Sequence, residues 1–190
     1  MTTYGEGYGK GMFIGCAFTL VMTLGTLPML LPAYEGQTEG PIIMTVAYVI
    51  LGITLGALGF KFRKEKIDNM PIVYGTSALA VGVMFILIGI FGLIANYAIA
   101  NPIGLVYQYV LDIVIGICAA IVAYMVKSKE TLGTMKIVII ILFVAMMAVS
   151  CWGIYMGISQ GMMVGMPMFN TLMISLVLTV FAAKGGPGAA

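Results

Sequence analysis

The sequence contains no histidine and very little charge. Without histidine the chain lacks the commonest metal ligand and proton shuttle, and it cannot build a Ser-His or Cys-His catalytic arrangement. Charged residues make up 8% of the 190 residues, whereas soluble domains carry about a quarter. These shortages exclude a water-soluble fold and most enzyme classes, and we expect no catalytic activity and no cofactor.

Net charge and cysteine are also low. Nine Lys and Arg against seven Asp and Glu give a net charge of +2, which is too weak a field to attract nucleic acid. The three cysteines, Cys16, Cys118 and Cys151, have no Cys-x-x-Cys spacing. We therefore expect no nucleic-acid partner, and we interpret the cysteines as buried small hydrophobic residues.

Long apolar runs are what the sequence does contain: 62% of its residues are hydrophobic and the mean hydropathy is +1.12. A helix that crosses the hydrocarbon core of a bilayer needs roughly 20 apolar residues. Six runs of about this length predict an all-α polytopic membrane protein, a single six-helix domain over 1–190 in which consecutive spans pack as antiparallel neighbours. The predicted spans are 11–33, 42–60, 71–97, 103–126, 137–158 and 168–183.

The basic residues alternate between the predicted connections. Lys10 precedes the first span, four cations lie within 61–66, three within 127–136, and Lys184 follows the last span, whereas the other connections hold only Glu35 and Glu39 as charges. Because Lys and Arg are retained on the cytoplasmic side, we expect both termini in the cytoplasm and a multi-pass protein of the plasma membrane. The first span is too long for a cleaved signal peptide.

Glycine is abundant and recurs at four-residue spacing, which lets membrane helices approach closely. The predicted helix-packing glycines are Gly52, Gly56, Gly153, Gly157, Gly161 and Gly165. One interpretation is ordinary packing within the bundle. The other is a groove that docks a helix of another membrane subunit or of a second copy of this chain.

Asp112 is the one charged side chain well inside a predicted span. Counting from Ile103 at about 1.5 Å per residue puts it roughly 13 Å below the outer end, near the midplane. No Lys, Arg or His lies within a span to pair with it. Three states follow: a protonated acid bonded to a neighbour, an ionised acid that binds a cation or faces water, or a pair with a cation of another chain.

The same helix carries further polar residues beside Asp112. Gln108 and Tyr109 lie four and three residues before it, and Tyr107 precedes them. We interpret Asp112, Gln108, Tyr109 and Tyr107 as a buried hydrogen-bond network, as the lining of a proton or solute pathway, or as an intersubunit contact.

Methionine is the remaining excess, at 17 residues. Thioethers are suitable ligands for Cu(I), and the cluster Met162, Met163, Met166 and Met168 has spacings that would supply two or three of them. Methionine is also a flexible apolar filler. Packing is the simpler interpretation, and a Cu(I) site is the alternative.

The six-span plan, the length and the cytoplasmic termini resemble the acetate and succinate uptake permeases. The first helix of that family opens with Asn-Pro-Ala-Pro-Leu-Gly-Leu, whereas the nearest string here is Asn-Pro-Ile-Gly-Leu over 101–105, at the start of the fourth span. The resemblance therefore covers topology without the signature motif, and it implies a small-monocarboxylate permease.

A central segment also resembles uncharacterised archaeal six-helix membrane proteins. It consists of Pro102, Tyr107 and Asp112, with Gln108 at a position where that family has Asn. This resemblance covers about fifteen residues and implies no activity.

Three hypotheses for function follow. The first is a non-catalytic accessory subunit of a larger membrane complex, which associates through glycine-rich helix faces. The second is a small-solute permease or channel with Asp112 on the pathway. It draws support from the polar residues near the midplane of the fourth span, in a bundle that can be divided into two inverted three-span halves as transporters often are. The similar starts at Met70 and Met135 indicate instead a division into three hairpins. The third is a Cu(I)-handling membrane protein.

Overall fold

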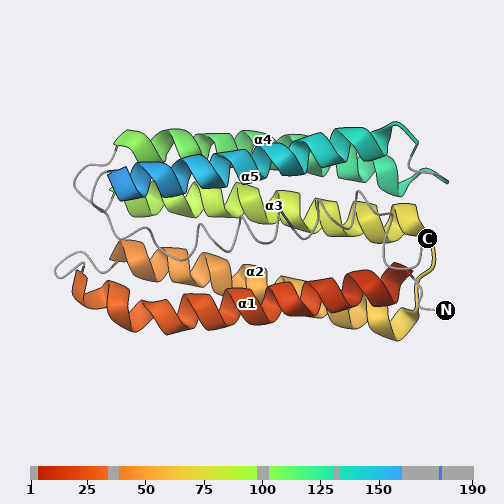
Figure 1. The fold of residues 1–190 in the computed structure, drawn as a ribbon, viewed down its shortest axis with the longest axis horizontal. Coiled ribbons are helices and arrows are strands. Elements are labelled where there is room, and N and C mark those ends of the chain that lie inside the picture. The colour runs from red at the N-terminus through yellow and green to blue at the C-terminus, as the bar shows by residue number, and fades with distance from the viewer. Residues whose placement is uncertain (1–3, 34–38, 98–102, 131–132, 160–175, 177–190) are drawn as a thin grey trace.

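The computed structural model describes residues 4–33, 39–97, 103–130, 133–159 and position 176, and the regular structure in these ranges is helical. Five of its helices are long and apolar enough to cross a membrane, which supports the predicted multi-pass membrane fold. The sixth predicted span, 168–183, lies outside the described residues except for position 176. The helices are α1 (Tyr4–Ala33), α2 (Glu39–Glu65), α3 (Met70–Tyr97), α4 (Ile103–Lys127) and α5 (Met135–Ser159) (Figure 1).

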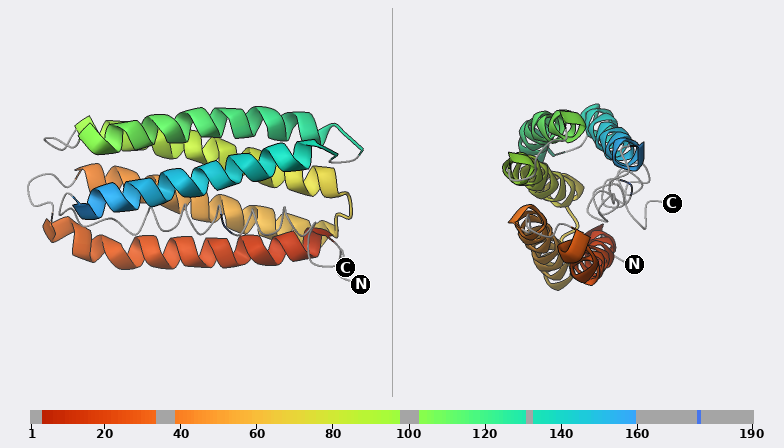
Figure 2. Two further views of the ribbon diagram at one scale, coloured as in Figure 1. Left: turned by 45° about the horizontal axis from the view of Figure 1, so that its top comes forward. Right: turned by 90° about the vertical axis from the view of Figure 1, so that its left-hand side faces the viewer.

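The five helices lie side by side along one axis and alternate in direction (Figure 1). Seen end-on, they follow one another around the bundle in chain order (Figure 2). Each helix packs against the next one in the chain, and α1 also touches α3. This arrangement agrees with the predicted antiparallel packing of consecutive spans.

Two helices run beyond their predicted spans at one end of the bundle. α1 begins at Tyr4 and α2 continues to Glu65. A helix continues into the headgroup region without losing backbone hydrogen bonds, and its charged side chains remain in water there. The Arg63 guanidinium lies 5.6 Å from the centre of the Phe13 ring, so a cation and an apolar surface meet at this edge.

The short connection between α2 and α3 has a defined geometry. Lys66 adopts a φ of 47°, the left-handed conformation that ends many helices. The Asn69 Oδ1 atom then accepts a hydrogen bond from the Ile72 amide at 3.1 Å and caps α3. The Gly5 amide donates to the Ile67 carbonyl at 2.9 Å, which joins the start of α1 to this turn.

Eight of the nine basic residues gather at this end of the bundle, which we call the basic end. It contains the start of α1, the α2–α3 turn and the α4–α5 turn (Figure 1). Lys184 lies outside the described residues. The eight residues are Lys10, Lys61, Arg63, Lys64, Lys66, Lys127, Lys129 and Lys136.

Exposed aromatic residues mark two levels along the bundle. Tyr107 and Tyr124 on α4 are 67% and 71% exposed, and their separation of 17 residues corresponds to about 25 Å of helix. Trp152 and Tyr155 are also exposed near the far end of α5. Tyr and Trp concentrate at both surfaces of a bilayer, and this spacing is close to the hydrocarbon thickness of about 30 Å.

Candidate functional site

The fourth helix directs a strip of polar side chains into the bundle. Asp112 and Gln108 are each 3% exposed, and Tyr109 is also buried. Tyr107 does not belong to this strip, because its side chain is exposed, so its assignment to a buried network is wrong, whereas a place on a pathway or in an intersubunit contact stays a prediction. It lies five residues from Asp112, about 140° around the helix, and its side chain faces outward at the level of the aromatic residues.

Gln108 is packed against the backbone of α5. A Cβ atom at Gly153 would overlap the Gln108 amide, including its Oε1 atom. Glycine at position 153 therefore provides the space that the amide occupies. The Gln108 Oε1 atom is buried and has no hydrogen-bond partner in the part of the chain that the structure describes.

Tyr109 and Tyr48 extend the polar strip to α3 and α2. The Tyr109 ring covers Gly92, and a Cβ atom at Gly89 would lie 2.6 Å from the Tyr109 carbonyl oxygen. Tyr48 on α2 is fully buried, and its hydroxyl lies within electrostatic range of the Asp112 carboxyl and of Tyr109. Sequence reasoning missed Tyr48, because nothing in α2 itself distinguishes this residue from a packing aromatic.

Buried polar residues from four helices lie at one depth, and we call them the polar layer. Counted along each helix from the basic end, they lie about 22 to 29 Å away. Seven polar residues are buried at this depth, from α1, α2, α4 and α5. They are Thr19, Thr23, Tyr48, Gln108, Tyr109, Asp112 and Ser150.

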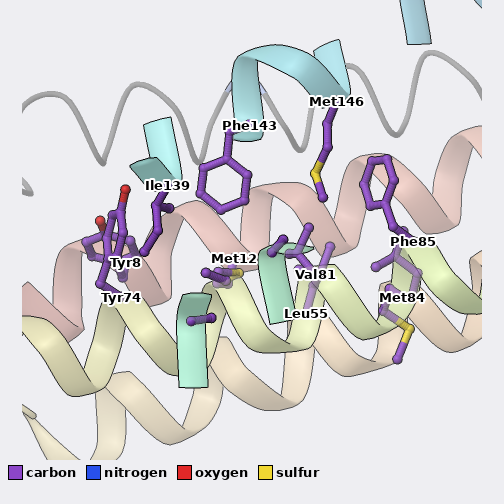
Figure 3. Packing of buried hydrophobic residues seen from close by; sticks show 14 of the residues in the cluster. Tyr8, Met12, Leu55, Tyr74, Val81, Met84, Phe85, Ile139, Phe143 and Met146 are labelled. Carbon is purple, nitrogen blue, oxygen red and sulfur yellow. The ribbon is translucent and has the colours of Figure 1, made fainter. Parts of the chain in front are cut away.

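Buried apolar side chains belong to one packed cluster between the polar layer and the basic end. They lie about 12 to 17 Å from the basic end and come from α1, α2, α3 and α5. We call them the apolar layer: Met12, Leu55, Val81, Phe143 and Met146, all buried (Figure 3). Nearer the basic end, the rings of Tyr8 and Tyr74 meet edge to face with centroids 6.2 Å apart.

Asp112 does not lie at the midplane, as the sequence predicted, but nearer the end of the bundle opposite the basic end. The apolar part of α4 runs over Val106–Lys127, so Asp112 is about 7 Å from its middle. It is covered by its own chain, which favours an internal network or a pathway over a direct pair with another subunit.

The predicted packing glycines for which the structure gives contacts are used within the chain. A Cβ at Gly52 would meet Leu20, one at Gly56 would meet Cys16, and one at Gly153 would meet Gln108. Nothing is described around Gly157, and Gly161 and Gly165 lie outside the described residues.

Glycines recur every seven residues where α3 packs closely against α4, and a search for four-residue spacing misses this repeat. Gly75, Gly82 and Gly89 on α3 lie against α4. A Cβ at any of them would lie 2.6 to 2.9 Å from a backbone oxygen of α4. The partners, Ala123, Gly116 and Tyr109, are also seven apart. The signal was present as matching seven-residue repeats in neighbouring spans.

Two of the remaining sequence predictions concern sulfur. The methionines proposed for Cu(I), Met162, Met163, Met166 and Met168, lie outside the described residues, so the copper site stays a prediction. The prediction that all three cysteines are buried is wrong. Cys118 and Cys151 are exposed and Cys16 is partly exposed, because a thiol is apolar enough to face lipid as well as protein.

Comparisons with protein-family models, with curated proteins and with solved structures find no match to this chain. The resemblances to the acetate and succinate permeases and to the archaeal proteins therefore stay predictions.

Proposed function

We propose that this protein is a small-solute permease or channel of the plasma membrane, with the polar layer as its solute route. The observation that carries the proposal is the burial of Asp112 by its own chain, at a depth where four helices have buried polar side chains. An ionisable residue inside a membrane bundle is costly, and such residues usually mark a transport pathway or a proton relay.

The apolar layer supports the same function. A transporter holds its route closed on one side of the binding site while the other side opens. Phe143 and Met146 from α5 pack with Leu55 and Val81 between the polar layer and the basic end. This packing corresponds to a closed barrier on that side. The positive charge of the basic end supports a cytoplasmic position for it.

The accessory-subunit hypothesis is the alternative. Of the glycine faces proposed to dock another helix, Gly52, Gly56 and Gly153 contact residues of this chain, whereas the surroundings of Gly157, Gly161 and Gly165 lie outside the described residues. An accessory subunit should co-purify with different chains after gentle solubilisation. A native particle made only of this chain would count against that role.

Transport by the isolated protein tests the proposal. We expect purified protein in liposomes to take up acetate driven by a pH gradient, or another small solute of a screening panel. Asp112→Asn removes the ionisable proton and keeps the shape, so we expect flux to fall at least tenfold. Ser77→Ala is the matched control, because the Ser77 hydroxyl is buried but bonded to its own helix, at 2.7 Å from the Val73 carbonyl, outside the polar layer.

Two results would contradict the transport role. One is that the panel contains no solute that crosses faster than in empty liposomes. The other is that the Asp112→Asn protein transports as fast as the unaltered chain.

A further inference from the structure

Two buried polar atoms of the polar layer, the Thr19 Oγ1 and the Gln108 Oε1, have no hydrogen-bond partner within the described residues. The Gln108 Oε1 is the one on the same helix as Asp112. An amide oxygen only accepts, and a buried acceptor without a partner is unfavourable. The contact with Gly153 holds the amide in this position, so the side chain is positioned for a partner that the described side chains do not supply.

Asp112 lies one helical turn from Gln108 on the same face of α4. The eight basic residues that the structure describes are nearer the basic end, roughly 13 Å or more from Asp112 along the helices. The polar layer therefore contains two unsatisfied groups within the described residues. Among these residues, the Asp112 carboxyl has no cation beside it, and the Gln108 Oε1 has no hydrogen-bond donor. One positive charge between them satisfies both.

Two further helices have oxygen-bearing side chains at the depth of Asp112. The Tyr48 hydroxyl of α2 is within electrostatic range of Asp112. Ser150 of α5 is at the same depth as Asp112, and its hydroxyl donates to the Met146 carbonyl at 2.9 Å.

The charge and the atom types select the ion. Oxygen ligands suit hard cations, and a single carboxylate balances a single positive charge. Divalent sites usually recruit several carboxylates, whereas no group of three His, Cys, Asp or Glu residues with metal-binding geometry occurs among the described residues. A proton on Asp112 would also neutralise the acid, and its O–H group would be a donor, so the dependence of stability on sodium or on pH distinguishes the two occupants.

We propose that the polar layer binds one monovalent metal cation of sodium size, with the Asp112 carboxylate and the Gln108 Oε1 atom as ligands. The inference rests on the proposed function, because the site lies on the proposed solute route and the ion would accompany or gate the solute. Binding itself requires no transport, so the two proposals are separable.

The test measures binding in detergent rather than flux. We expect the melting temperature of the purified full chain to rise saturably with NaCl and not with choline chloride at equal ionic strength. Equilibrium binding of radioactive sodium should approach one ion per chain. Asp112→Asn and Gln108→Met should each abolish the sodium-dependent shift, and Ser77→Ala should retain it.

Gly153→Ala provides an independent variant, because it changes no polar atom and only displaces the Gln108 amide. We expect it to weaken sodium binding at least tenfold. If the Asp112 variant does not fold, this variant and the binding stoichiometry of the unaltered chain still decide the question.

The inference is overturned if sodium gives no more stabilisation than choline and no radioactive sodium binds. It is also overturned if stability follows pH alone, which would identify a proton site, or if Asp112→Asn binds sodium as tightly as the unaltered chain. Sodium binding without flux of any solute would instead contradict the proposed function. Flux without sodium binding would leave the function standing and remove the cation site.

Discussion

The α3/α4 pair and the α1/α2 pair are both antiparallel and both glycine-lined, yet they pack differently along their length. In α3/α4, glycines at 75, 82 and 89 bring the two backbones together over the whole span. The contact in the middle of the pair is reciprocal, since a Cβ at Gly82 would lie 2.9 Å from the Gly116 carbonyl oxygen, and one at Gly116 would lie 2.7 Å from that of Gly82.

The α1/α2 pair makes this kind of contact only near the basic end. A Cβ at Gly9 would lie 2.8 Å from the Gly59 carbonyl oxygen, and one at Gly59 would lie 2.9 Å from that of Gly9. Farther along, glycines meet only side chains: Gly56 faces Cys16, and Gly25 has nothing within 4 Å of its Cβ position. The pair is tight at one end and looser at the other.

The difference indicates where the bundle is able to move. Backbone contacts leave no side chains to rearrange, whereas side-chain contacts repack when helices shift. The looser half of α1/α2 contains Thr19 and Tyr48, which belong to the polar layer. We therefore expect the polar layer to open by movement of this half against a rigid α3/α4 pair.

Gly82→Leu should break the rigid pair and have the largest effect. Its side chain would meet backbone atoms of α4 at under 3 Å, which forces the helices apart. Overpacking of this kind costs about 3 kcal/mol or more when backbone must move. Thermal unfolding in detergent, followed by the loss of monodisperse protein, measures it. Val83→Leu is the matched control, because Val83 faces outward and should unfold as the unaltered chain does.

Much of this architecture could be predicted from the sequence, because bilayer thickness sets helix length and apolar runs report it. The predicted spans 42–60 and 137–158 correspond to α2 and α5 in this way. Asp112 and Gln108 were also predictable, since polar residues four apart share one face and lipid excludes them.

Helix faces and tertiary contacts were less predictable. In a membrane, lipid-facing and interior residues are equally apolar, so hydrophobic periodicity does not orient a helix. Tyr107 was assigned to the buried network because it is a sequence neighbour of Gln108, but its side chain is exposed. Cys118 and Cys151 were expected to be buried, but they are exposed, because a thiol fits either environment. Tyr48 joins the site because the bundle brings its hydroxyl within electrostatic range of Asp112, which no local pattern in α2 indicates.

Gly56→Cys should sharpen the comparison by locking the looser half of α1/α2. A Cβ at position 56 would lie 3.8 Å from the Cys16 Cβ and 3.0 Å from its Sγ, which fits disulfide geometry. We expect rapid oxidation to one intramolecular bond, about 2 to 4 kcal/mol of added stability, and slower solute flux that recovers on reduction.

The disulfide is measured by intact mass, as a loss of two hydrogens, and by protection from alkylation. The same substitution combined with Cys16→Ala is the control, because it lacks the partner thiol and should keep its flux under oxidation. If the two thiols do not couple, α1 and α2 do not have the alignment described here. If they couple and flux is unchanged, the looser half does not move during transport.

Gly9→Ala and Gly15→Ala compare the two halves within a single helix. A Cβ at Gly9 meets a backbone oxygen at 2.8 Å, whereas at Gly15 the nearest atom is the Leu55 Cδ1 at 3.4 Å. We expect Gly9→Ala to lower the free energy of unfolding by about 1 to 2 kcal/mol. Gly15→Ala should change it by less than about 1 kcal/mol, because Ala favours a helix and the contact is nearly ordinary. Equal losses at both positions would mean that α1/α2 is uniformly tight.

Gly25→Ala should have the smallest effect and the opposite sign. No atom lies within 4 Å of its Cβ position, so the added methyl group meets no steric resistance. Replacing glycine by alanine inside a helix gains up to about 1 kcal/mol through backbone entropy, and we expect a small rise in melting temperature. The matched substitution Gly82→Ala makes the same chemical change at a backbone contact and should be destabilising. If Gly25→Ala also destabilises the protein, its surroundings are filled, and the movement proposed for this half of α1 would need a different origin.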